Sequence, residues 1–268
     1  IPGECEVKPD WPGDRQLRMI RWPGLQYPRF PDYDDLQPNP GNVLVLNQET
    51  PAKAGDFKVV PSLEEPMGTT EVTVNWTEKA LDLNFICEDS GLVTGEKGHD
   101  NIKLWRNDCI YIWLEPEHDH GLDGSKKIMI QVAANGFCHD VQQDEKDYDV
   151  KAIKIKTTRS KTGWAVQVSL PFKGLGMKTP KPGDVWGINF SRMDQPGKLD
   201  MDLMQNSSWV SIGYVGDLFK TGDLWGHLIF ADKGATDSVS ARKAMDATHR
   251  KIIDRYYSKE YLLKAHLE

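Results

Sequence analysis

The chain of 268 residues is 39% hydrophobic and 9% aromatic, and its formal net charge is −7 at pH 7. A chain of this length and hydrophobic content can bury a sizeable core, so we expect one main domain with extensions. The acidic balance disfavours nucleic acids and anionic membrane surfaces as partners, and no apolar run approaches the roughly 20 residues that span a bilayer.

The first 42 residues hold eight prolines interleaved with five aromatic residues. Proline fixes φ and removes a backbone donor, so this density excludes a helix or a central strand. Disordered segments are poor in aromatic residues. We therefore predict an ordered extended arm that packs on the body of the protein, or alternatively forms one wall of a binding site. The chain begins with Ile1 rather than Met, which suggests that a leader was removed and leaves export open.

From residue 43 onward the sequence indicates strands, because apolar and polar residues alternate in short runs that end at turn-forming residues. No amphipathic helical pattern separates these runs before residue 231. The fold class that this arrangement favours is all-β, an antiparallel β-sandwich. The strands are predicted at residues 43–46, 57–60, 71–76, 80–87, 109–114, 128–132, 150–157, 163–170, 186–190, 209–212 and 226–230.

The clearest pair of strands covers residues 109–114 and 128–132, which the polar loop 117–126 connects as a hairpin. Isoleucine and leucine occupy one face of the first strand, so Tyr111 is expected to point to the other face. Trp105 precedes this strand among polar and turn-forming residues, where it either plugs the end of the sandwich or binds a ligand. The residues predicted to be buried are Ile110, Ile112, Leu114, Ile130, Val132, Trp164, Val166, Val168, Ile188 and Phe190.

The tail of the chain changes character, because apolar residues such as Met245 and Ile252 fall near helical spacing between charged ones. No proline or glycine interrupts the tail after Gly234. We predict a C-terminal helix that packs on the body, or alternatively one that docks another module. The predicted division is an extended arm at 1–42, a β-sandwich at 43–234 and a helical extension at 235–268.

The four cysteines have neither the CxxC spacing nor the cysteine and histidine spacing of a zinc site. Cys87 and Cys109 fall inside predicted strands and suit small buried positions. Cys5 and Cys138 lie in less regular segments and could pair if the protein is exported. The sequence leaves that disulfide open.

The loop between the two central strands gathers four acids and two histidines within residues 115–124. Asp119 and Asp123 offer the carboxylate oxygens that calcium prefers, and His118 and His120 offer nitrogens to a softer metal. The loop lacks the EF-hand spacing, so a plain hairpin tip is the alternative. The sequence predicts no cofactor, with calcium as the exception left open.

The catalytic motifs of common enzyme classes are absent: the sequence has no GxSxG, P-loop, HExxH or dinucleotide fingerprint. A glycosidase needs two carboxylates on either side of one bond. Asp108 and Glu115 flank the central strand and would point to opposite faces of it. We therefore predict that these acids are solvated surface or turn residues, and that the protein is not an enzyme.

Several short segments together resemble the family 9 carbohydrate-binding modules and the bacterial stand-alone proteins similar to them. Their order and spacing match across about residues 57–231, and the arm and the C-terminal helix lie outside this region. The segments that carry the resemblance are residues 70–88, 104–108 with the following strand, 163–172, 182–192, 208–209 and 224–228.

The resemblance implies a β-sandwich that binds sugars without cleaving them, with a terminal sugar held between two aromatic rings. By position, Trp105 is the first ring and Phe219 the second. Tyr111 stands where the family has a glutamate, and Gln131 and Ala133 stand where it has an arginine and an asparagine. These changes remove the charge-assisted hydrogen bonds that the family's charged residues would make with a sugar, so the ligand can differ from that of the family. The resemblance also implies that structural calcium can be present.

The function predicted from the sequence is non-catalytic carbohydrate binding in polysaccharide utilisation, in a secreted, periplasmic or cell-surface protein associated with glycoside hydrolases. The predicted sugar contacts are Trp105, Phe219, Tyr111 and Gln131. The alternatives are a glycoside-active hydrolase, a structural partner domain that uses the C-terminal helix, and a haem-binding sandwich. The ligands of a haem would come from Met129, Met201, Met204, His139 and His227. The sequence does not indicate an oligomeric state.

Overall fold

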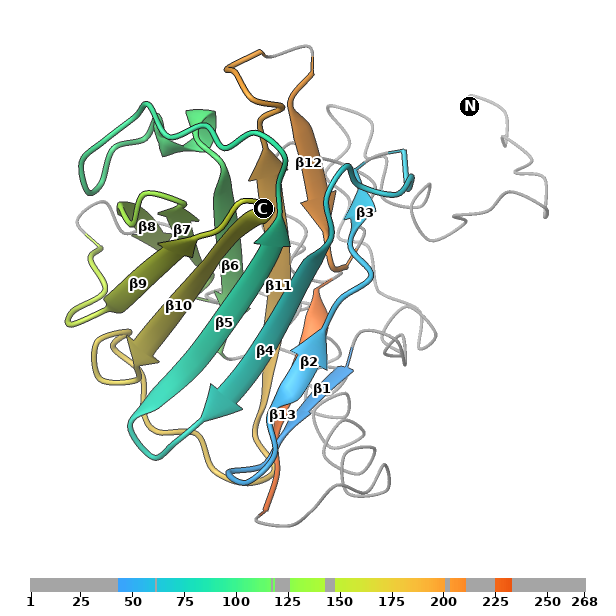
Figure 1. Cartoon of the computed structure of the whole chain (residues 1–268). Coiled ribbons are helices and arrows are strands. Elements are labelled where there is room, and N and C mark those ends of the chain that lie inside the picture. Colours follow the sequence, from blue (N-terminus) through green and yellow to red (C-terminus); the bar gives the residue numbers. More distant parts are fainter. Residues whose placement is uncertain are drawn as a thin grey trace, which may run out of the picture.

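The structure of the protein is a computed structural model that describes residues 43–60, 62–116, 118, 126–142, 148–200, 203–210 and 225–232. Within these ranges, two β-sheets face one another across a hydrophobic core (Figure 1). The predicted β-sandwich is confirmed. The predicted arm at 1–42 and helix at 235–268 lie outside the described residues. The strands are β1 (Val43–Leu46), β2 (Ala52–Ala54), β3 (Lys58–Val59), β4 (Thr70–Trp76), β5 (Ala80–Glu88), β6 (Cys109–Glu115), β7 (Ile128–Ala133), β8 (Cys138–Gln142), β9 (Lys154–Arg159), β10 (Gly163–Pro171), β11 (Val185–Asp194), β12 (Gln205–Ser208) and β13 (Gly226–Phe230).

The larger sheet has eight strands in the order β1-β13-β11-β6-β7-β8, with β12 paired to β11 and β3 paired to β12. The smaller sheet has five strands in the order β2-β4-β5-β10-β9. The prediction of an antiparallel sandwich is wrong at one pair, because β1 runs parallel to β13. These two strands come from opposite ends of the sandwich sequence, so no hairpin turn sets their relative direction.

The core lies between the inner faces of the two sheets and follows the predicted alternation. All ten residues predicted to be buried are at most 2% exposed, so that prediction is confirmed. Phe85 of β5 meets Phe190 of β11 edge to face, with 5.5 Å between ring centroids. Trp76 of β4 meets Phe230 of β13 in the same way at 5.1 Å. These aromatic contacts join the sheets directly.

The central hairpin has the predicted register. β6 and β7 pair antiparallel, with Ile112 opposite Ile130 in the core and Tyr111 opposite Gln131 on the other face. Tyr111 packs with residues outside the main core, as its strand phase predicts. The hairpin therefore presents Tyr111 and Gln131 side by side on the outer face of the larger sheet.

Two predicted strands are displaced, and two strands were not predicted. The strand expected at 150–157 is β9 at Lys154–Arg159, and the one expected at 209–212 is β12 at Gln205–Ser208. Trp209 and Val210 bury their side chains as expected. Beyond β12, however, the side chain of Asn189 accepts a hydrogen bond from the Val210 backbone and ends the ladder. β2 and β8 were not predicted, because β2 is short and β8 is polar, so neither shows a clear alternation of apolar and polar residues.

Replacing Phe190 by alanine should lower the free energy of unfolding by about 3–5 kcal/mol, because the ring packs between sheets and leaves a cavity. Denaturant unfolding followed by tryptophan fluorescence measures this loss. Ile86→Ala is the matched control, since Ile86 lies on β5 with 51% of its surface exposed, and it should change stability by less than about 1 kcal/mol. Similar losses in the two variants would contradict the packing described here.

Candidate functional site

Trp105 lies in a short 3₁₀ turn, η3 (Leu104–Arg106), that precedes β6. Leu104 is fully buried and anchors the turn. The side chain of Asn107 also holds the turn in place through two hydrogen bonds to the backbone of Glu96. The Asn107 side-chain NH₂ donates to the Glu96 carbonyl, and the Asn107 side-chain oxygen accepts from the Glu96 backbone amide, each at 2.9 Å. The Trp105 ring is half-buried. The Arg106 guanidinium lies 5.4 Å from its centroid, in cation–π range.

Tyr111 and Gln131 form a hydrogen-bonded pair on adjacent strands. The Gln131 amide donates to the Tyr111 hydroxyl at 3.0 Å and to the Cys109 sulfur at 3.2 Å. Burial holds the pKa of Tyr111 well above its usual value, so its hydroxyl stays protonated. Tyr111 packs with Leu104 in one apolar cluster, which places this pair beside the turn that carries Trp105.

The predicted set of sugar contacts is therefore brought together in part. Trp105, Tyr111 and Gln131 come from η3, β6 and β7, which adjoin one another at one end of the larger sheet. Gln131 is only 2% exposed, so its amide serves the Tyr111 hydroxyl more directly than an incoming ligand. Phe219 lies outside the described residues. The facing of two rings across a cleft stays a prediction.

An aromatic stripe that was not predicted as a unit runs along the same outer face. The rings of Tyr111 and Trp113 are stacked, with centroids 5.9 Å apart and an interplanar angle of 14°. Trp225 lies next in line, 6.0 Å from Trp113. The Trp113 indole donates to the Ser191 hydroxyl at 3.1 Å, and Met129 packs against the rings. The signal for this stripe was present in the sequence, because Tyr111 and Trp113 share one strand phase.

A buried group of one acid and two histidines lies further along this face. His118 Nε2 is 2.6 Å from His227 Nδ1, and His118 Nδ1 is 3.5 Å from Glu115 Oε2. All three side chains are buried. A β-carbon added at Gly187 would lie 2.7 Å from His118, so only glycine leaves room for the ring.

This group corrects one prediction. Glu115 is not a solvated residue, because its side chain is fully buried beside His118 at the end of a central strand. His118, whose nitrogens the sequence offers to a softer metal, is also buried, and its ring packs against that of His227. The other residues proposed for that loop, Asp119, Asp123 and His120, lie outside the described residues.

The candidate haem ligands fall in separate environments. His227 contacts His118, while His139 on β8 lies 3.9 Å from Asp100. Met129 packs in the aromatic stripe, and Met204 packs against the cluster that contains Leu104. Met201 lies outside the described residues. The described candidates do not converge on one axis, which disfavours the haem alternative.

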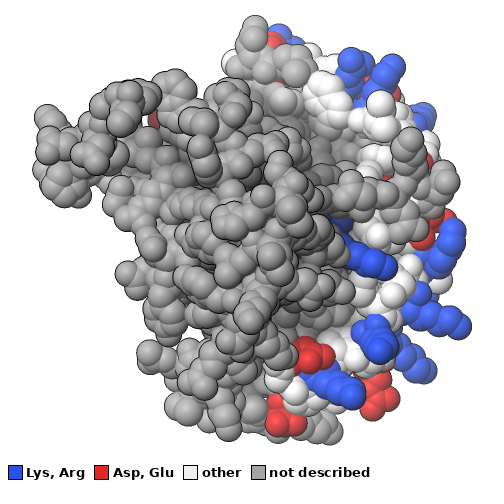
Figure 2. Space-filling model, turned by 180° about the vertical axis from the view of Figure 1, so that it is seen from behind, with Lys and Arg blue, Asp and Glu red and all other residues white. Residues whose placement is uncertain are grey.

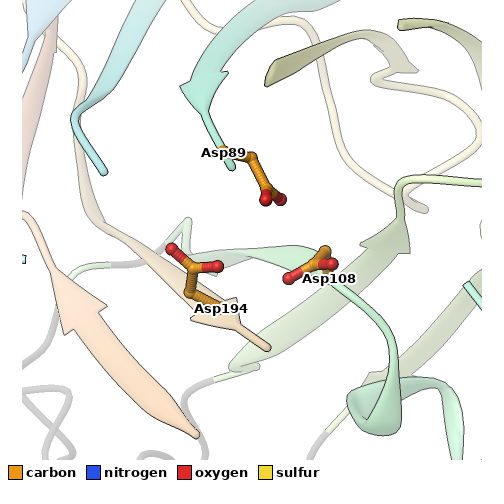
Figure 3. Close-up of side chains that lie close together, drawn as sticks. All are labelled: Asp89, Asp108 and Asp194. Atoms are coloured by element: carbon orange, nitrogen blue, oxygen red, sulfur yellow. The ribbon is translucent and has the colours of Figure 1, made fainter. Parts of the chain in front are cut away.

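Three aspartates point toward one another at the end of the sandwich nearest η3, as Figure 3 shows. Asp89 follows β5, Asp108 precedes β6 and Asp194 ends β11, and one carboxylate oxygen from each lies within 4.8 Å of the others. The Arg192 guanidinium is 2.9 Å from Asp194 and 3.6 Å from Asp89. Asp108 is fully buried, so its prediction as a solvated residue is wrong.

The cluster contains more negative than positive charge if all its groups are ionised. Burial raises the pKa of Asp108 to about 7, although hydrogen bonds from the backbone amides of Gln195 and Val93 act to lower that pKa. Burial also raises the pKa of Asp194, although Arg192 opposes the shift. Arg192 balances one of three carboxylates, so a proton or a cation must compensate much of the remaining charge.

The donor set of this cluster fits the calcium that the family resemblance implies. Carboxylate oxygens are the ligands that calcium prefers. The Oδ2 atom of Asp89 is buried and has no hydrogen-bond partner among the described residues, so it has lone pairs to offer. Asp89, Asp108 and Asp194 would hold the ion, which would supply positive charge to a buried acidic cluster.

The described cysteines Cys87, Cys109 and Cys138 are buried free thiols, and Cys5 lies outside the described residues. No helix in the described part of the chain is long and apolar enough to cross a membrane. Figure 2 shows the molecule from behind, where basic and acidic side chains are interspersed along the described edge. The exclusion of nucleic acid as a partner stays a prediction.

In the presence of a calcium chelator, the protein should be more stable at pH 5 than at pH 8 by on the order of 2 kcal/mol from Asp108 alone. Its raised pKa means that the folded state binds the proton more tightly than the unfolded state, so this stability is lost as pH rises toward about 7. Urea unfolding at both values measures it. The Asp108→Asn variant should lose this pH dependence, while Asp100→Asn, at an exposed position, should keep it. An unchanged difference in Asp108→Asn would assign the effect to other groups.

At pH 8, adding calcium to the chelated protein should raise its melting temperature, because an ion that binds only the folded state stabilises it by mass action. The rise should be smaller at pH 5, where a proton on Asp108 competes with the ion. Asp89→Asn should reduce the rise, since it removes one of the three carboxylates that would hold the ion. A melting temperature independent of calcium would mean that protons and Arg192 alone compensate the cluster.

Comparisons with known proteins support the family resemblance. The family model described as carbohydrate family 9 binding domain-like matches residues 50–233. Among solved structures, a carbohydrate-binding module of family 9 from Caldicellulosiruptor kristjanssonii in complex with cellotriose has a TM-score of 0.53 and 14% identity, over 72% of this chain and 95% of that one. A family 9 module from the same organism in complex with glucose has a TM-score of 0.51 and 13% identity, over 73% of this chain and 99% of that one.

These identities show a shared fold and do not transfer a ligand. No curated protein sequence matches the chain. The family model, however, covers more than half of the chain, and it spans both sheets of the sandwich. The protein therefore belongs to the carbohydrate family 9 binding domain-like family.

Proposed function

We propose that this protein binds carbohydrate without cleaving it, at the end of the larger sheet where Trp105 lies beside Tyr111 and Gln131, with Phe219 as the second ring. Family membership supports this function. The solved family 9 modules from Caldicellulosiruptor kristjanssonii hold cellotriose and glucose, which makes these two sugars the first ligands to test.

The observation that carries the proposal is the placement of Trp105. Its ring is half-buried on a short turn, and the Arg106 guanidinium and the Asn107 side chain hold that turn in place. A sugar ring has an apolar C–H face, which a fixed indole can desolvate at little entropic cost. The neighbouring Tyr111 hydroxyl offers a hydrogen bond to the sugar edge.

The two acids beside the central strand support binding rather than hydrolysis. Asp108 accepts hydrogen bonds from two backbone amides, one on each carboxylate oxygen. Glu115 is buried beside His118. A glycosidase needs an acid and a base that both reach the scissile bond, and neither carboxylate is presented to solvent. The hydrolase alternative would therefore need other acids.

We place this function in polysaccharide utilisation outside the cytoplasm, as a secreted, periplasmic or surface protein that works beside glycoside hydrolases. Family membership supports this setting. In this proposal residues 43–234 form the binding module. The arm at 1–42 and the helix at 235–268 are extensions of it.

Trp105→Ala should weaken the binding of cellotriose about thirtyfold, because losing the ring removes about 2 kcal/mol of apolar contact. Its melting temperature should change little, since the ring is half-buried. Isothermal titration calorimetry and thermal melting in one buffer measure the two effects. Ile102→Ala is the matched control, because Ile102 is apolar, 71% exposed and close to the same turn.

Unchanged affinity together with a large fall in melting temperature would show that Trp105 only plugs the end of the sandwich. A core role of that kind would cost about 3–5 kcal/mol of folding free energy. Incubation of the wild-type protein with the same sugars should release no reducing ends. Release of reducing ends would favour the hydrolase alternative.

A further inference from the structure

The outer face of the smaller sheet contains an open hollow of about 360 Å³ over β4, β5, β10 and β9, and most of the residues that line it have polar side chains. Figure 1 shows this sheet in front, on the opposite side of the sandwich from β6 and β7. A volume of this size falls within the range of small-molecule sites. The hollow is therefore distinct from the proposed site at Trp105, which belongs to the larger sheet.

Strand register arranges the side chains of the hollow in two rows across the sheet. The first row is Asn75, Asp82, Ser169 and Lys154, which are consecutive partners from β4 to β9. The second row is Thr73, Asn84, Gln167 and Lys156. Neighbouring strands lie about 4.8 Å apart, so each row is a regular ladder of polar groups.

The depth of the hollow follows from the sizes of these side chains. Four short side chains, Thr73, Asp82, Asn84 and Ser169, are half-buried and form its floor. Gln167 and the two lysines of β9 are exposed and form one rim. Short side chains on β4 and β5 and at Ser169 of β10 lie beside longer ones at Gln167 and on the edge strand β9, which leaves a trough rather than a flat sheet.

The polar side chains on the floor of the hollow are not engaged by other residues that the structure describes. Within the described ranges, none of the four floor side chains makes a hydrogen bond or an ion pair. Side-chain amides and hydroxyls both donate and accept hydrogen bonds, which matches the hydroxyl groups of a sugar. Half-buried polar groups that face a hollow are satisfied only by water or by a ligand.

The charged side chains around the hollow favour some polar ligands over others. Lys154 and Lys156 lie two residues apart on β9, and neither makes an ion pair with any described residue. Their partners across the strand pair are Ser169 and Gln167, which are neutral. Asp82 is the single acid that lines the hollow, and it lies on the second strand from β9. The rim on β9 is therefore a basic edge without an ion pair to any described residue, beside a hydrogen-bonding floor whose one charged side chain is Asp82.

We propose that this hollow is a second carbohydrate site, and that its ligand is an acidic polysaccharide whose uronate carboxylates contact Lys154 and Lys156. The sugar hydroxyls meet Asn84 and Gln167, which pair directly across β5 and β10. The hollow is open along the sheet, so it takes the side of a chain rather than its end. Its binding does not depend on Trp105.

The experiment uses the full chain and two soluble polymers, polygalacturonate as the acidic probe and hydroxyethylcellulose as the neutral one. Affinity electrophoresis or calorimetry in low salt should show that wild-type protein binds polygalacturonate, and that higher salt weakens this binding. The double variant Lys154→Gln and Lys156→Gln should bind it about tenfold more weakly, equivalent to about 1.4 kcal/mol. The double variant Asn84→Ala and Gln167→Ala should show a loss of similar size.

Two controls separate this site from general charge and from the proposed site at Trp105. Lys178→Gln with Lys181→Gln removes the same charge from an exposed loop outside the hollow and should leave binding unchanged. Trp105→Ala should weaken cellotriose binding and leave polygalacturonate binding intact. Melting curves of all variants establish that each is folded.

Four results would overturn the proposal. The first is the absence of polygalacturonate binding by the wild type. The second is an equal loss in the Lys178 and Lys181 control, which would show a general charge effect. The third is a loss in Trp105→Ala, which would assign the polymer to the larger sheet. Binding of hydroxyethylcellulose alone, weakened by Asn84→Ala and Gln167→Ala, would overturn the acidic ligand.

Discussion

The carboxylate of Asp108 ties together the loops at the end of the sandwich where the proposed sugar site lies. It accepts hydrogen bonds from the backbone amides of Val93 and Gln195, which belong to the loops after β5 and β11. The backbone carbonyl of Asp108 also accepts from Ala134 after β7. The Gln195 amide side chain in turn donates to the Trp105 carbonyl. One buried side chain thus fixes the entry to β6 and, through Gln195, the turn that carries the indole.

The same end of the sandwich also carries its most concentrated charge. Arg192 lies on the larger sheet, yet its guanidinium reaches the carbonyl of Thr69 and the hydroxyl of Thr70 at the start of β4 in the smaller sheet. Ion pairs in such a buried place cost desolvation, so their net contribution to stability is small, whereas removing one partner is costly. The cluster therefore fixes the relative position of the two sheets more than it contributes to the free energy of unfolding. Because burial raises the pKa of Asp108 and of Asp194, we expect the charge at that junction to change with pH.

The sequence predicted those parts of the structure in which strand alternation decides the outcome. Ile112 and Phe190 point inward because a strand of period two must bury its apolar face, and the opposition of Tyr111 and Gln131 follows from the same hairpin. The prediction of a strand at 209–212 failed because the side chain of Asn189, rather than a backbone carbonyl, accepts the hydrogen bond from the Val210 backbone amide. It also failed for Asp108 and Glu115, because alternation gives the face of a strand but says nothing about what covers that face. The hollow on the smaller sheet was missed for a related reason, since it combines the β4–β5 hairpin with β10 and β9, which are distant from that hairpin in sequence.

The two sheets differ in how their outer faces meet the surroundings, and this difference bears on what each can recognise. On β6, the outward positions hold Tyr111 and Trp113, whose rings stack, and Trp113 is 6% exposed. A ligand at the larger sheet therefore meets the half-exposed Trp105 at its end. On β5, the outward positions hold Asp82 and Asn84, which stay half-buried in an open trough. A ring at a sheet end suits one sugar unit, while a trough across four strands suits the side of a polymer. Because the sites proposed here lie on opposite sheets, one polysaccharide chain bound along the trough leaves the turn at Trp105 free to hold the terminus of another.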